Sequence, residues 1–156
     1  LFFLLLNLIA SNASANLALV DTTKIKKLMD ESFVLLFTNP EKSEIQIKES
    51  LKMSRDIQYT FGEVKSLNIL GMIADVQGEY LQAIKRYNEA LTIIHNLSEV
   101  KQSIKLLQSS TYNGLGLAYY HKSDYEQAIK YFILGLDLAE QTSSDNAKVN
   151  FYNNIG

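Results

Sequence analysis

The chain has 156 residues, a size that suits one domain or a short array of repeats, and 47% hydrophobic with 21% charged residues is ordinary for a folded protein. The formal net charge is -2 and the charges are interspersed, which argues against a nucleic-acid partner because no broad basic face could neutralise phosphates. The chain has no cysteine, so it has no disulfide framework, thiol nucleophile or thiolate metal site. One proline and seven glycines favour helices over closely spaced strands.

The first fifteen residues carry the pattern of a secretory signal. Leu1 to Ala10 form an apolar run, and Ala13-x-Ala15 matches the small residues that precede a signal-peptidase cut. The run is shorter than the roughly 20 residues that span a bilayer as a helix. We predict a signal peptide over residues 1–15, truncated at its start because neither an initiator Met nor a basic stretch precedes Leu1. The alternative is an amphipathic or buried N-terminal helix of a cytoplasmic domain, since short apolar runs are ambiguous.

Apolar residues at spacings of three and four then predict two helices, over residues 22–37 and from residue 41 to about 59. Asn39-Pro40 separates them, because the residue before a proline is pushed away from helical angles and a proline fits the first turn of the next helix. We expect the pair to form a degenerate first hairpin over residues 22–62.

Two more hairpins follow in the sequence, over residues 63–98 and 99–146. The turn of the earlier one is Gln77-Gly78-Glu79 and that of the later one His121-Lys122-Ser123. Ser123 followed by Glu126 predicts a capping box at the start of the last of these helices. A further helix is expected from about Ala147, so residues 147–156 would begin another repeat.

These later hairpins share one pattern: a large residue, x-x-Leu-Gly, and then Ala-x-x-x-aromatic-x-x-small. The residues expected to pack the repeats are Gly71, Ala83, Tyr87 and Ala90 in one copy and Gly116, Ala128 and Phe132 in the next. Glycine would let two helices approach closely, alanine would lie opposite, and the aromatic ring would fill the gap to the next repeat. Tyr152 to Gly156 matches Tyr112 to Gly116 position for position. Repeated helix pairs that cannot be buried alone predict an all-α solenoid of antiparallel helix hairpins.

The spacing resembles the tetratricopeptide repeat (TPR), whose pattern is W-x-x-L-G-x-x-Y, then A-x-x-x-F and a terminal proline. The resemblance covers about residues 22–156. It implies a right-handed superhelix that is not catalytic, needs no cofactor and binds a protein or peptide partner. The departures are His95 and Glu140 at the proline position, Ala74 for the aromatic, Gly135 for alanine, and Ser43, Ile47 and Ser50 in the first hairpin. Equivalent glycines lie 45 and 40 residues apart, against a usual period of about 34, and we expect longer helices to absorb the difference.

The arrangement as a whole also resembles the N-terminal extracytoplasmic TPR region of bacterial sensor histidine kinases and related regulators. The shared features are the long period, the Asn39-Pro40-Glu41-Lys42 segment and the preceding signal peptide. The resemblance implies a periplasmic location and a membrane connection only through a missing downstream segment, with room for a kinase domain in the missing C-terminal part. The alternative is a cytoplasmic TPR adaptor or assembly factor.

No residues form a recognisable catalytic or metal site. His95 and His121 lie on different repeats without metal-ligand spacing, and Gly114-Leu115-Gly116 lies inside a predicted helix, where it serves packing. We therefore predict no catalytic residue, no metal and no cofactor.

The surface with the clearest binding pattern is the stripe of each first helix that faces away from its partner helix. By resemblance it lines a concave groove, with Lys65, Asn68, Met72, Asp75, Ser110, Asn113, Leu117, Tyr120, Asn150 and Asn153 as the candidate ligand-binding residues. Asparagine recurs at one position, and an amide ladder could hold an extended peptide backbone. The alternative is that these amides bridge neighbouring helices or face water.

Overall fold

The computed structural model describes residue 19 and residues 21–155. The predicted signal peptide lies outside the described residues. Within them every regular element is a helix, which confirms the all-α prediction. The helices are the first helix (residues 21–35), α2 (Pro40–Asp56), α3 (Thr60–Val76), α4 (Tyr80–His95), α5 (Gln102–His121), α6 (Tyr125–Gln141) and α7 (Asp145–Ile155).

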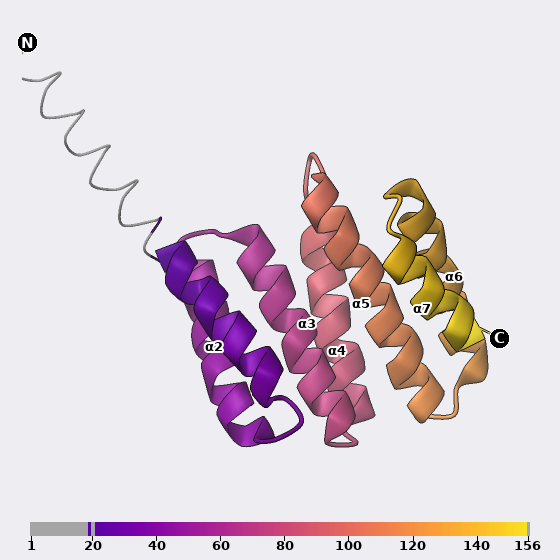
Figure 1. Ribbon diagram of the computed structural model, residues 1–156, viewed down its shortest axis with the longest axis horizontal. Coiled ribbons are helices and arrows are strands. Elements are labelled where there is room, and N and C mark those ends of the chain that lie inside the picture. Colours follow the sequence, from indigo (N-terminus) through magenta and orange to yellow (C-terminus); the bar gives the residue numbers. More distant parts are fainter. Residues whose placement is uncertain (1–18, 20, 156) are drawn as a thin grey trace, which may run out of the picture.

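The helices form a row of antiparallel pairs that follow one another in chain order (Figure 1). The first helix pairs with α2, α3 with α4, and α5 with α6, while α7 packs against α6 as α5 packs against α4. Each contact therefore lies within a hairpin or between neighbouring hairpins. This is the packing of a helical-repeat solenoid.

Most connections are turns of three residues with the same backbone geometry. The middle residue has a positive φ in each of them: Gln58 (55°), Gly78 (79°), Ser123 (65°) and Ser143 (53°). A left-handed residue ends a helix and reverses the chain in a short distance, both inside the hairpins α3–α4 and α5–α6 and between successive hairpins at Gln58 and Ser143. Glycine is the residue that adopts it most easily, and only one of the four turns has it.

The predicted capping box at Ser123 is wrong. Ser123 is the left-handed residue of the turn, and the N-cap of α6 is the next residue, Asp124, whose side chain accepts a hydrogen bond from the backbone N–H of Gln127. The register therefore moves by one residue. At α2 the N-cap is Asn39, whose side chain accepts from the N–H of Lys42, and Pro40 begins the helix as predicted.

Glycine and aromatic residues fit together between the helices. A Cβ on Gly71 would lie 2.7 Å from the ring of Tyr87, and one on Gly114 would overlap the same ring, so Tyr87 is held between α3 and α5. Phe132 lies against Gly116 in the same way. Tyr87 and Phe132 are each 2% exposed, and Ala83, Ala90 and Ala128 are also buried. The glycines thus make room for rings that join one repeat to the next.

The first hairpin uses serine where the later ones use alanine. Ser43 donates to the backbone oxygen of Ser32 at 2.7 Å, and Ser32 donates back to that of Ser43 at 3.0 Å. The hydroxyls of Ser50 and Ser66 lie 2.9 Å apart and join α2 to α3. All four side chains are buried, so the small side chains let the helices approach while each hydroxyl finds a partner.

The spacing of 45 residues between Gly71 and Gly116 exceeds the 40 between Gly116 and Gly156 for two reasons. The connection between α4 and α5 spans residues 96–101, and α5 has 20 residues where α3 has 17. Longer helices were predicted to absorb the excess; in this interval the structure divides it between a longer helix and a longer connection. Among the described helices, none is long and apolar enough to cross a membrane.

Candidate functional site

A groove of about 580 Å³ lies along the first helices of successive hairpins. The first helix, α3, α5 and α7 all contribute residues to its lining, and α4 contributes one. Its lining is Phe33 from the first helix, Leu36 and Phe37 from the turn that follows it, Asn68, Met72, Asp75 and Val76 from α3, Tyr87 from α4, Ser109, Ser110, Asn113, Gly114, Leu117 and His121 from α5, and Ala147, Asn150 and Phe151 from α7. We call this surface the groove.

Most of the predicted binding residues lie in the groove. They are Asn68, Met72, Asp75, Ser110, Asn113, Leu117 and Asn150. Three others do not line it. Lys65 lies one turn before Asn68, and its Nζ is 3.6 Å from Oδ1 of Asp30. Tyr120 is half exposed and packs its ring against His121 and Tyr125, while Asn153 is exposed on α7.

The recurring asparagines bridge helices. Asn68 is 7% exposed; its Oδ1 accepts from the hydroxyl of Thr111 at 3.0 Å, and its Nδ2 donates to the backbone oxygen of Leu107 at 3.4 Å. Asn113 accepts from Nδ2 of Asn154 at 2.9 Å. The amides of Asn68 and Asn113 therefore link α3 to α5 and α5 to α7. This agrees with the interpretation that these amides bridge neighbouring helices. Their use as a ladder for a ligand backbone stays a prediction.

The apolar part of the groove includes two exposed aromatic side chains, Phe33 and Phe37. Phe33 is 51% exposed and Phe37 71% exposed, whereas Leu36 between them is fully buried. The sequence indicates this exposure, because the five consecutive apolar residues Phe33-Val34-Leu35-Leu36-Phe37 cannot all lie on one buried helix face. Together with Met72 and Leu117, these rings offer apolar surface to a partner.

The Asp75 carboxylate of the groove is hydrogen-bonded to His121. Nδ1 of His121 lies 2.9 Å and 3.1 Å from the two carboxylate oxygens of Asp75, which joins the ends of α3 and α5. Burial, and to a smaller extent the Asp75 carboxylate, raise the pKa of the Tyr87 phenol above its ordinary value. Tyr87 is therefore neutral near pH 7. No other ionisable group of the described residues lines the groove, so its chemistry is apolar and amide-rich.

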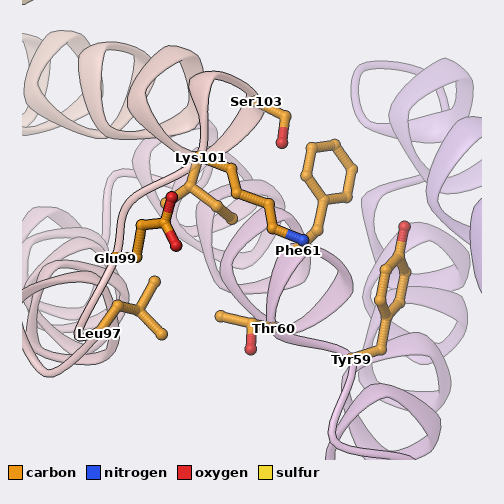
Figure 2. A pocket seen from close by; sticks show the side chains of 8 residues that line it. Tyr59, Thr60, Phe61, Leu97, Glu99, Lys101 and Ser103 are labelled. Atoms are coloured by element: carbon orange, nitrogen blue, oxygen red, sulfur yellow. The ribbon is translucent and has the colours of Figure 1, made fainter.

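A second cavity of about 530 Å³ lies beside the long connection between α4 and α5. Figure 2 shows Lys101 extending toward Phe61, with Glu99 and Leu97 on the side of the connection and Tyr59 and Thr60 on the side of the α2–α3 turn. Only Ile104 of this lining is buried. Within residues 21–155, no group of three His, Cys, Asp or Glu side chains is placed to hold a metal ion.

The architecture defines a helical-repeat solenoid, and comparisons with known proteins identify the repeat. Residues 109–142, which cover most of α5 and all of α6, match the family model of the tetratricopeptide repeat. The matched unit excludes the first turns of α5, the part that lengthens the spacing. This segment is a TPR, as the sequence pattern predicted.

The fold as a whole is similar to that of a solved TPR domain. The TPR domain of Arabidopsis FLU superposes with a TM-score of 0.64 at 19% sequence identity, over 78% of this chain and 98% of that chain. No curated protein matches the chain. The likeness shows the TPR fold, which is typically non-catalytic and generally binds protein partners.

Proposed function

We propose that the chain is a protein-interaction module whose groove binds a peptide segment bearing large apolar side chains. The observation that carries this is the exposure of Phe33 and Phe37 beside Met72 and Leu117, in a groove whose Asp75 carboxylate is already bound to His121. A partner that buries apolar area here gains about 25 cal/mol per Å². Within residues 21–155 the groove lining has no Lys or Arg, so an acidic segment would lose hydration there without finding an opposite charge to pair with.

Peptides selected from a random display library on the full chain test this proposal. Leu117→Lys should weaken their binding at least about tenfold, because the apolar contact is replaced by a charge without a partner. The matched control is Leu81→Lys on α4, since Leu81 is 71% exposed and lies outside the groove. Thermal unfolding of each variant separates lost binding from lost folding. Equal binding by the two folded variants would remove the groove from the function.

For the whole protein, the proposal is an extracytoplasmic sensory or scaffolding region of a larger bacterial signalling protein. The support is the apolar run of residues 1–10, Ala13-x-Ala15 and the long repeat spacing. N-terminal sequencing of the mature protein should find that residues 1–15 have been removed. A soluble cytoplasmic chain that retains them would favour the adaptor or assembly factor instead.

A further inference from the structure

The face of α7 that points away from the neighbouring hairpin is apolar and exposed. Val149 is 55% exposed, Tyr152 56% and Ile155 39%. None of the three lines the groove. They recur at spacings of three residues, so they lie on one side of the helix.

The same positions are covered in the earlier repeats. Adding 45 and then 40 residues aligns α3 with α5 and α7, so Val149 corresponds to Val64 and Ser109, and Ile155 to Leu70 and Leu115. Those four side chains are at most 6% exposed. Val64 and Leu70 belong to one buried cluster with Ala90 and Ile94 of α4. Tyr131 of α6 packs against the cluster that holds Leu115, and Ser109 donates to the backbone oxygen of Gly135 in α6 at 3.0 Å.

Tyr152 shows the same difference. Its counterpart in α3, Leu67, is fully buried, and its counterpart in α5, Tyr112, stacks on Tyr131 of α6 with ring centroids 6.2 Å apart. Phe151, which packs on Gly135 of α6, is buried like Ser66 and Thr111 at the equivalent positions. The contact of α7 with the preceding hairpin is therefore the same as in the other repeats, and Val149, Tyr152 and Ile155 differ from their counterparts in lacking a second helix over them.

We propose that α7 is the first helix of a further hairpin and that Val149, Tyr152 and Ile155 form the docking face for its second helix, in the same chain. The covering helix follows a three-residue turn and carries small-x-x-x-aromatic-x-x-small. Both α4 and α6 have this pattern, as Ala83, Tyr87 and Ala90 and as Ala128, Phe132 and Gly135. This inference is independent of the groove and its partner.

A copied segment of this chain can test whether Val149, Tyr152 and Ile155 form a docking face. A copy of residues 117–141 added after Gly156 continues the α5–α6 pattern in register, because Gly156 aligns with Gly116. The extension should slow amide hydrogen exchange of residues 145–155 at least about tenfold and raise the unfolding midpoint by about 5 °C. The matched control is the same extension with its copies of Phe132→Ala and Ala128→Lys, which should do neither.

Substitutions on α7 show whether the extension acts through this face. Tyr152→Ser combined with Ile155→Ser should shift the midpoint of the unextended chain by less than about 2 °C and abolish the gain from the extension. If the extended chain does not fold, a free peptide of residues 124–141 replaces it, with protection of α7 expected for that peptide and not for its Phe132→Ala form.

Three results would overturn the proposal. One is that neither the extension nor the peptide protects α7. Another is an equal loss of stability on Tyr152→Ser in extended and unextended chains, since the face would then already be covered. The last is a dimer of the unextended chain in sedimentation with α7 already protected, which would make a second copy the occupant.

Discussion

Tyr87 and Phe132 are the residues on which the stacking of the repeats depends. Each ring lies where a glycine of a neighbouring helix has no side chain, and Tyr87 touches glycines of two different helices. A ring buried in this way removes a large apolar area from water and fixes the spacing of the helix axes at once. The pairing of glycine with an aromatic residue explains why both occur at the same positions in successive repeats.

Gly116→Ala tests this fit at a single atom. In a helix the change from glycine to alanine normally stabilises by about 1 kcal/mol. Here the added Cβ would overlap the ring of Phe132, so we expect a net loss of about 1–3 kcal/mol in the free energy of unfolding. Urea denaturation measures it, with Ser110→Ala at an exposed position of α5 as the control. A stability equal to or above that of the natural chain would contradict the packing described.

Among the elements, the helices and their pairing could be predicted from the sequence. The apolar spacings and the glycine–aromatic pattern are local signals, and the helices begin and end within a few residues of the predicted positions, except that α5 begins at Gln102 rather than near Glu99. The N-cap of α6 could not be placed correctly, because Ser123 and Asp124 are both good capping residues and only the backbone angle of Ser123 decides between them.

The roles of individual polar residues were harder to predict. Asn68 and Thr111 are 43 residues apart in sequence, and their hydrogen bond depends on how two hairpins stack. The hydrogen bond between His121 and Asp75 has the same origin. Ser43 replaces alanine without a change of fold because its hydroxyl is bonded to Ser32, and residue type alone does not reveal such a partnership.

At the scale of the whole molecule, the stacking of the hairpins forms a groove that no single repeat has. The groove takes side chains from the first helix, α3, α5 and α7, so its shape depends on every hairpin (Figure 1). Helices that contact only their neighbours can shift slightly relative to one another, and a bound segment that touches four of them would hold the array in one curvature. Binding of a peptide in the groove should therefore stabilise the folded protein against unfolding.

The methionines provide the most direct measurement of binding in the groove. The chain has three: Met29 is buried in the core, Met53 packs against the same core, and Met72 lines the groove. In a ¹³C-methyl-labelled protein titrated with a peptide selected on the full chain, we predict that the Met72 methyl signal shifts with saturation while those of Met29 and Met53 stay in place. Saturable binding that leaves the Met72 signal unchanged would contradict the account.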